Sequence, residues 1–194
     1  MIWIQLQRIV HLNYYLYHYH LRDAILHNPC RTYLEVGCGA GAVSKFIDDT
    51  LHYEEYLGVD IDEKRIRYAA AKYGARENTH FRSGDVRQLP IDKDYDCLLL
   101  VGFLHHVPNN ECLSLVRYVL PRITRKIVIL EPIFVYRSVR ANLYERYLEK
   151  GEHRRSVTQV KELLDQSGVR IDLEYTSRQA IGLFDFWCGI SDLR

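Results

Sequence analysis

Three glycines at alternate positions, Gly37, Gly39 and Gly41, follow an apolar run from Thr32 to Val36. A helical pattern of apolar residues comes next, so this segment predicts a strand, a tight turn and a helix. Glycine suits such a turn because it lacks a Cβ, which frees the backbone angles and lets a ligand approach the main chain. The first turn of the helix then presents unpaired N–H groups to whatever lies above. The spacing also fits the dinucleotide fingerprint G-x-G-x-x-A, so the glycines alone leave the ligand open.

Acidic residues and a pair of histidines stand at the ends of three later apolar runs. Asp60 comes at the end of the second run, Asp85 follows the third, and His105 and His106 follow the fourth. Ligands of open parallel sheets bind beyond the carboxyl ends of the strands, so we expect these side chains and the glycine turn to share one edge. Carboxylates accept hydrogen bonds, and histidine titrates near neutrality, where it can act as a general base.

The elements that must position these residues alternate between strand and helix. This alternation predicts an α/β fold with a doubly wound, mostly parallel sheet and helices on both faces. The expected strands are 32–36, 56–62, 80–86, 96–102 and 126–132, then 170–176 and 183–190, which form a hairpin around Gly182. The expected helices are 43–49, 63–73, 110–120 and 158–167.

The chain reads as a single domain, 1–194, with two segments outside this alternation. Residues 1–29 show helical spacing and are rich in aromatic residues, so we expect a helical lid, a packing helix or a dimer contact. His18 and His20 would lie about 200° apart on a helix, which disfavours a metal site there. Residues 133–156 break the alternation and are expected to cover the acceptor side of the site.

Charge, cysteine content and the length of the apolar runs limit the partners and the location that the chain can have. The formal charge of +1 favours neither nucleic acid nor an anionic membrane as a partner. The five cysteines are odd in number and scattered without a C-x-x-C pair, which indicates reduced thiols and a cytoplasmic location. No apolar run approaches the roughly 20 residues that span a bilayer, and the N-terminus lacks the pattern of a signal peptide.

Four motifs in order resemble those of the class I S-adenosylmethionine-dependent methyltransferases of the small-molecule type. The glycine turn reads E-V-G-C-G-A-G, the second strand ends G-V-D-I-D, the third turn reads G-D-V-R-Q-L-P, and the fourth strand runs into L-H-H-V-P. The resemblance covers the chain from about Thr32 to the end. It implies a Rossmann-like sheet whose seventh strand is antiparallel, S-adenosyl-L-methionine as cofactor, and S-adenosyl-L-homocysteine as product.

The resemblance also implies which residues hold the donor. Glu35 and the glycine turn would hold its methionine and ribose portions, Asp60 the ribose hydroxyls, and Asp85 the adenine amine. Ile61 and Val86 would enclose the adenine ring. The donor residues implied are Glu35, Gly37, Cys38, Gly39, Gly41, Asp60, Ile61, Gly84, Asp85, Val86, Gly102 and Phe103. No metal is implied.

Two groups of residues are candidates for the acceptor side. His105 and His106 follow the fourth strand, where one could serve as a base while the other shapes the loop. The second group is Tyr144, His153, Arg154 and Arg155, which could bind an anionic or sugar-like small molecule. A surface helix laced by ion pairs explains the charges of that second group equally well.

Three alternatives stay open at this point. A nicotinamide-dependent oxidoreductase would also place an acidic residue such as Asp60 about 20 residues after the glycines. A nucleic-acid methyltransferase is disfavoured because no [DN]-P-P-[YFW] tetrapeptide follows the fourth strand and no recognition domain is evident. A non-catalytic binding protein of the same fold is the third. The sequence leaves monomer and homodimer undecided.

Overall fold

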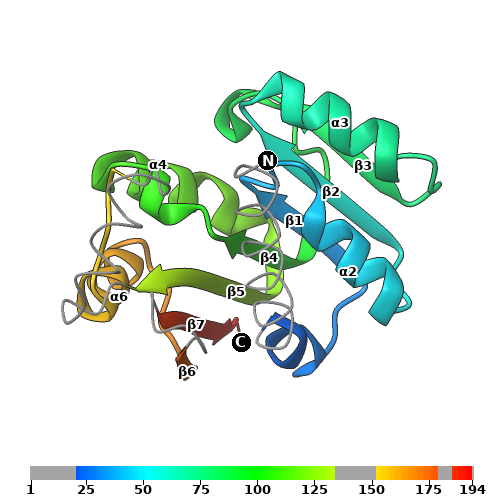
Figure 1. Cartoon of the computed structure of the whole chain (residues 1–194). Coiled ribbons are helices and arrows are strands. Elements are labelled where there is room, and N and C mark those ends of the chain that lie inside the picture. Colours follow the sequence, from blue (N-terminus) through cyan, green and yellow to red (C-terminus); the bar gives the residue numbers. More distant parts are fainter. Residues whose placement is uncertain (1–20, 134–151, 179–184, 194) are drawn as a thin grey trace, which may run out of the picture.

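A single mixed sheet forms the centre of the computed structural model, which describes residues 21–133, 152–178 and 185–193 (Figure 1). Its seven strands lie in the order β3-β2-β1-β4-β5-β7-β6. The strands are β1 Thr32–Val36, β2 Glu55–Asp60, β3 Thr79–Ser83, β4 Tyr95–Val101, β5 Ile123–Ile133, β6 Leu173–Arg178 and β7 Asp185–Asp192. The helices are α2 Ala42–Thr50, α3 Glu63–Tyr73, α4 Asn109–Val119 and α6 Val157–Gln166, with short 3-10 turns η1 Val86–Gln88, η2 Leu104–His106 and η3 Leu120–Arg122.

The pairing of the strands confirms the predicted fold class. Strands β1 to β5 pair in parallel, and β7 is antiparallel to both β5 and β6 between which it lies. The order of the strands reverses between β1 and β4. Ligands of doubly wound sheets bind at such a switch point, so the topology itself singles out the glycine turn after β1 and the loop after β4.

Buried side chains cover both faces of the sheet, as the continuous apolar strands predict. Successive residues of β1 alternate between the faces: Tyr33 packs with residues 21–26, which are helical, and with α2, whereas Leu34 packs with α4 and α6. Figure 1 shows α4 and α6 together, well separated from α2 and α3. This two-layer covering holds the strand ends in fixed positions.

A buried lysine joins the first described helix to the sheet. Lys126 on β5 is fully buried, and its Nζ lies 2.6–3.2 Å from four main-chain carbonyl oxygens between Ala24 and Asn28. Carbonyl groups at the C-terminus of a helix are left without partners inside the helix, and a cation there is favourable. Lys126 therefore anchors the segment that leads into β1.

The sequence places most elements to within a few residues. Strand β5 begins at Ile123, three residues before the predicted start, and β6 and β7 both lie a little later than expected. Helix α6 begins after Ser156, whose side chain and that of Gln159 cap each other's backbone N–H groups. A capping box of this type fixes the start of a helix.

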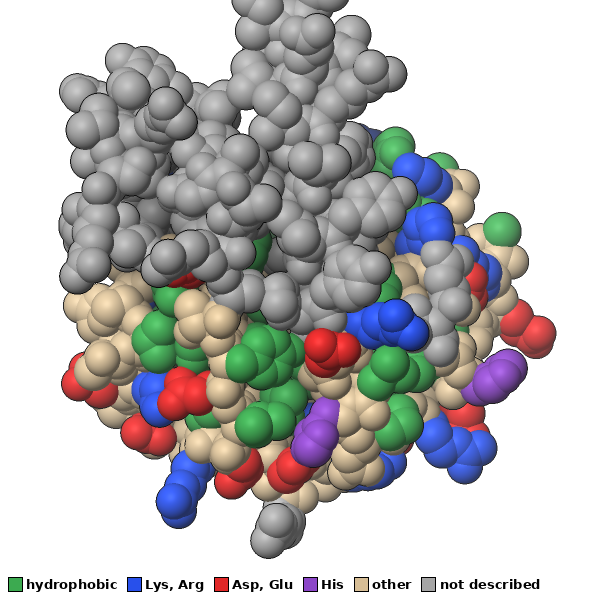
Figure 2. Space-filling model, turned by 60° about the horizontal axis from the view of Figure 1, so that its bottom comes forward, with side chains coloured by type: hydrophobic (Ala, Val, Ile, Leu, Met, Phe, Trp, Pro, Cys, Tyr) green, Lys and Arg blue, Asp and Glu red, His purple; other side chains and the backbone are tan. Residues whose placement is uncertain are grey.

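Several predictions concern residues outside the described ranges. The proposed lid at 1–29 is described only from residue 21, and the insertion at 133–156 only at residue 133 and from residue 152, while Gly182 lies outside altogether. Within the described ranges, no helix is long and apolar enough to cross a bilayer. All five cysteines are buried free thiols. Acidic and basic side chains are interspersed on the face shown in Figure 2.

Candidate functional site

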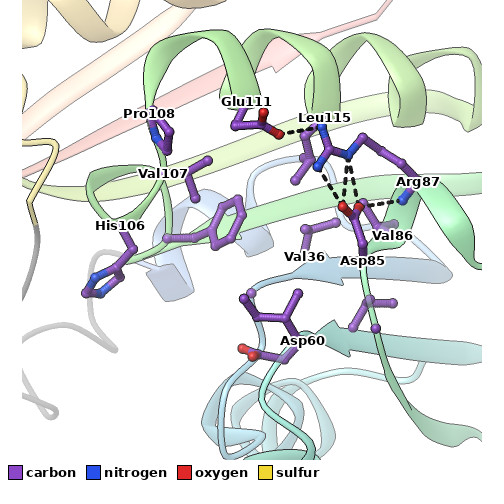
Figure 3. Close-up of a pocket in the computed structure, with 15 residues that line it drawn as sticks. Val36, Asp60, Asp85, Val86, Arg87, His106, Val107, Pro108, Glu111 and Leu115 are labelled. Carbon is purple, nitrogen blue, oxygen red and sulfur yellow. Dashed lines mark hydrogen bonds and ion pairs between the residues drawn. The ribbon is translucent and has the colours of Figure 1, made fainter.

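A cavity of about 260 Å³ opens at the carboxyl ends of β1, β2 and β3 and extends to the start of α4 (Figure 3). Its lining comes from the four segments that the sequence singles out, together with the first residues of α4. The lining residues are Val36, Gly37, Val59, Asp60, Ile61, Gly84, Asp85, Val86, Arg87, Phe103, His106, Val107, Pro108, Glu111 and Leu115. The predicted convergence on one edge of the sheet is therefore present in the structure.

Asp60 at the end of β2 is held by main-chain N–H groups. The N–H of Gly39 donates to Asp60 Oδ2 at 2.8 Å, and the N–H of Asp62 donates to Asp60 Oδ1 at 2.8 Å. A carboxylate oxygen has two lone pairs, so each oxygen retains one acceptor site after these bonds. Two neighbouring acceptor sites on one fixed carboxylate match two neighbouring hydroxyl groups, such as those of a ribose.

Gly37 allows the loop after β4 to rest directly on the glycine turn. Its φ is +79°, and a Cβ built there would lie 2.1 Å from Cδ2 of Phe103. A side chain at this position would therefore both strain the backbone and push the Phe103 ring away. The N–H of Gly37 donates to the carbonyl of Val59 at 2.8 Å, which joins the turn to β2.

Glu35 lies on the opposite face of β1 from the cavity. Its side chain is 1% exposed and accepts a hydrogen bond from the hydroxyl of Tyr56. Burial raises the pKa of Glu35 to about 8, with a further contribution from the charge of Asp60, and the Tyr56 hydrogen bond opposes the rise. Because side chains alternate along a strand, Val36 rather than Glu35 points into the cavity.

An ion-pair network closes one end of the cavity. Arg87 contacts both carboxylate oxygens of Asp85, and its Nη1 donates to Glu111 Oε2 at 2.6 Å (Figure 3). The Arg87 guanidinium holds the pKa of the Asp85 carboxyl below its usual range. A fixed carboxylate at this end can accept a hydrogen bond from an amine or a hydroxyl of a bound molecule.

The two histidines of the loop after β4 have different surroundings. His105 is 5% exposed, and its Nδ1 lies 2.7 Å from Oε2 of Glu131 on β5. His106 is exposed and lines the cavity at the end opposite Arg87 (Figure 3). His106 is therefore the histidine placed to meet a bound molecule, and His105 shapes the loop.

Glu131 organises the main chain of that loop. Its side chain is buried, and Oε1 accepts hydrogen bonds from the N–H groups of Phe103 at 2.8 Å and Leu104 at 2.7 Å. Oε2 accepts from the N–H of His105 at 3.3 Å. One buried carboxylate thus satisfies the three N–H groups at the start of η2.

Arg155 holds the same loop through its carbonyl groups. The guanidinium is largely buried, with Nη1 2.6 Å from the oxygen of Leu104 and Nη2 2.6 Å from the oxygen of Val107. Nη1 also donates to the carbonyl of His153 at 3.0 Å, and Nε to the side chain of Asn109 at 2.8 Å. The loop is therefore fixed between a buried anion and a buried cation.

Comparison with known proteins agrees with this geometry. Residues 34–122, from β1 to the end of η3, match the family model described as a methyltransferase domain. A segment of 77 residues is 31% identical to a fatty-acid O-methyltransferase of Mycolicibacterium smegmatis, and it covers 39% of this chain and 28% of that relative. The alignment thus spans less than a third of the relative.

Solved structures share the fold over most of the chain. Magnesium protoporphyrin IX methyltransferase from Synechocystis, solved with bound S-adenosylhomocysteine, superposes with a TM-score of 0.66 at 16% identity and covers 92% of this chain and 80% of that one. The chain therefore has the fold of these methyltransferases. The pyocyanin biosynthetic protein PhzM has a TM-score of 0.70 at 18% identity, with 92% of this chain and 54% of that protein covered.

The lining of the cavity contains seven of the twelve predicted donor residues. These are Gly37, Asp60, Ile61, Gly84, Asp85, Val86 and Phe103. The other five, Glu35, Cys38, Gly39, Gly41 and Gly102, lie in the same segments but outside the lining. Among them, Gly39 acts through its N–H on Asp60, and Cys38 packs its sulfur against Gly58. Their contact with a donor stays a prediction.

The predicted acceptor residues are only partly described. Tyr144 lies outside the described residues, and His153 meets the loop through its main chain, where its N–H donates to the carbonyl of His105 at 3.0 Å. Arg154 is half-buried. The guanidinium of Arg155 already binds four protein oxygens, so a further bond to an acceptor stays a prediction that competes with these contacts.

Sequence reasoning missed three charged residues of the site. No sequence motif marks Arg87, Glu111 or Glu131, because each makes a contact with a distant segment. Two weak signals exist in retrospect: Arg87 stands two residues after Asp85, and Glu131 ends a run that is otherwise apolar.

Proposed function

We propose that this chain binds S-adenosyl-L-methionine in the cavity and transfers its methyl group to a small-molecule acceptor. The observation that carries the proposal is the state of Asp60. Its two oxygens are each held by one main-chain N–H and each retain one acceptor site beside the glycine turn. A ribose diol is the group that such a carboxylate fits.

Other residues of the lining fit the remaining parts of the same molecule. Ile61 is 80% exposed and Val86 is buried, and both line the cavity, so their apolar surfaces can enclose a planar base. Asp85 can accept a hydrogen bond from the adenine amine. The missing Cβ of Gly37 lets Phe103 pack on the turn and form the wall between the base and the acceptor side.

The donor, when bound, supplies a methyl group already activated by its sulfonium. The protein then needs mainly to align the acceptor, because positioning alone lowers a barrier by several kcal/mol. His106 is exposed at the acceptor end of the cavity and can take a proton from a hydroxyl acceptor. The relative from M. smegmatis is named as an O-methyltransferase, which is consistent with an acceptor that is methylated on oxygen.

We further propose a cytoplasmic enzyme that works as a monomer or homodimer. The five buried free thiols support a reducing location. Residues 1–29 and 133–156 stay our candidates for the segments that cover the acceptor.

A binding test separates this function from the oxidoreductase alternative. S-adenosylmethionine at 100 times its dissociation constant should stabilise the protein by about 2.7 kcal/mol, whereas NAD should leave the melting temperature unchanged. Stabilisation by NAD alone would overturn the proposal.

A turnover test separates an enzyme from a binding protein. The chain is incubated with the donor and pooled small metabolites, and release of S-adenosylhomocysteine is followed. We expect release above the level without acceptor and a loss of this release in Asp60→Asn. Donor binding without release in any pool would support a non-catalytic binding protein instead.

A further inference from the structure

Arg87 occupies most of the hydrogen-bonding capacity of Asp85. Asp85 Oδ1 accepts from the main-chain N–H of Arg87 at 2.9 Å and from its Nε at 3.0 Å. Asp85 Oδ2 accepts from Nη2 at 2.6 Å and has a longer contact of 3.2 Å with the same Nε. Both lone pairs of Oδ1 are thus used, and Oδ2 retains one acceptor site.

This arrangement differs from that of Asp60, the other carboxylate in the lining. Asp60 retains an acceptor site on each oxygen, whereas Asp85 retains a single site on one oxygen. A single directed acceptor fits one N–H of an amine and repels a carbonyl oxygen at the same place.

The position of Arg87 is itself fixed from α4. Its Nη1 donates to Glu111 Oε2 at 2.6 Å and lies 3.1 Å from the hydroxyl of Ser114. Figure 3 shows the guanidinium between Asp85 and Glu111 at the end of the cavity. A planar guanidinium that bridges two carboxylates has little freedom to rotate, so the orientation of Asp85 is determined by a separate element of the fold.

We infer that Arg87 is a positioning residue that makes the donor pocket selective for a base with an amine, by aiming the single open acceptor site of Asp85 into the cavity. This inference rests on the proposed function, because the base in question is the adenine of the donor. Arg87 does not need to touch the donor for this role.

Two product analogues that differ only in the base give a direct test. S-adenosylhomocysteine carries the amine, and S-inosylhomocysteine carries a carbonyl oxygen in its place. Calorimetry measures both dissociation constants for the wild type and for Arg87→Met, which keeps most of the aliphatic stem. We expect Arg87→Met to weaken binding of the adenosyl compound roughly tenfold and binding of the inosyl compound less than twofold. This is the size of effect expected for loss of one charge-assisted hydrogen bond.

Two further variants make the result specific. Arg87→Lys keeps the charge without the planar fork and should restore only part of the discrimination. Arg82→Met is the matched control, because Arg82 is an exposed arginine of β3 outside the lining whose Nη1 donates to the carbonyl of Pro90. It should leave both dissociation constants unchanged.

The possible results separate the inference from the proposed function. If Arg87→Met raised both dissociation constants by the same factor, Arg87 would only support the shape of the pocket, and the inference would be overturned. Unchanged binding of the adenosyl compound would overturn it as well. A wild type that binds neither compound would instead refute the proposed function. Arg87→Lys decides the question if Arg87→Met does not fold.

Discussion

The two sides of the cavity are held in place by different means. On the side of β1 and β2, Asp60 is fixed by the main-chain N–H groups of Gly39 and Asp62. Gly39 belongs to the glycine turn, and Asp62 follows the end of β2. On the side of β4, the loop 103–108 is fixed by the buried side chains of Glu131 and Arg155, which come from distant parts of the chain.

Because of this difference, substitutions on the two sides should affect different properties, ligand binding on one side and stability on the other. A main-chain cradle persists when the side chain that it holds is replaced, so changes at Asp60 should act mainly on the ligand. A buried charge that satisfies several main-chain groups leaves those groups unpaired when it is removed, and each unpaired group costs about 1–3 kcal/mol. Changes at Glu131 or Arg155 should therefore act first on stability.

The largest effect is expected for Glu131→Leu. The change leaves the N–H groups of Phe103, Leu104 and His105 without their acceptor in a buried site, so the free energy of unfolding should fall by about 3–5 kcal/mol. Urea denaturation followed by circular dichroism measures this change. A loss under 1 kcal/mol would mean that the loop does not depend on the buried carboxylate.

Arg155→Met should come next, with a loss of about 2–4 kcal/mol from the carbonyl groups of Leu104 and Val107. The same urea titration applies. Arg170→Met, at an exposed arginine, is the control and should lie within about 0.5 kcal/mol of the wild type. Should Arg155→Met be as stable as this control, the residue would be available for the acceptor instead of the loop.

Asp60→Asn tests the other side of the comparison. The amide keeps the shape but places an NH₂ group against one main-chain N–H, so one acceptor site and one supporting bond are lost. We expect the dissociation constant for S-adenosylhomocysteine to rise roughly thirtyfold to more than a hundredfold, which is a loss of about 2–3 kcal/mol in binding free energy. The free energy of unfolding should change much less. Titration calorimetry and urea denaturation of one preparation give both numbers. A variant that loses stability but keeps the wild-type dissociation constant would reverse the comparison.

The smallest effect for a single step of the experiment, one pH unit, concerns Glu35. Its pKa rises from 4.5 to about 8 in the folded protein, so between these values the folded state holds a proton that the unfolded state has released. Stability should therefore fall as pH rises from about 5 to 8, by up to about 1.4 kcal/mol per pH unit, and level off above that range.

Glu35→Gln, which cannot ionise, should remove this part of the pH dependence. Urea titrations of both proteins at several pH values make the comparison. Parallel stability curves for the two proteins would show that Glu35 is ionised in the folded state over the whole range.

The difference between the two sides also explains what the sequence could predict. The glycine turn, Asp60 and Asp85 were predictable because each stands at the end of an apolar run, and parallel strands bring such ends together. The orientation of Glu35 was also within reach, since alternation along β1 places it opposite Val36. The contacts of Glu131 and Arg155 with the loop and the Arg87–Glu111 pair were not, because these partners lie more than 20 residues apart and no local pattern encodes the pairing.

A crystal structure with S-adenosylhomocysteine would test the central claim most directly. We expect both ribose hydroxyls within hydrogen-bonding distance of the Asp60 oxygens, with the base between Ile61 and Val86. A ribose bound away from Asp60, or a cavity that stays empty at saturating ligand, would contradict the assignment of this cavity to the methyl donor.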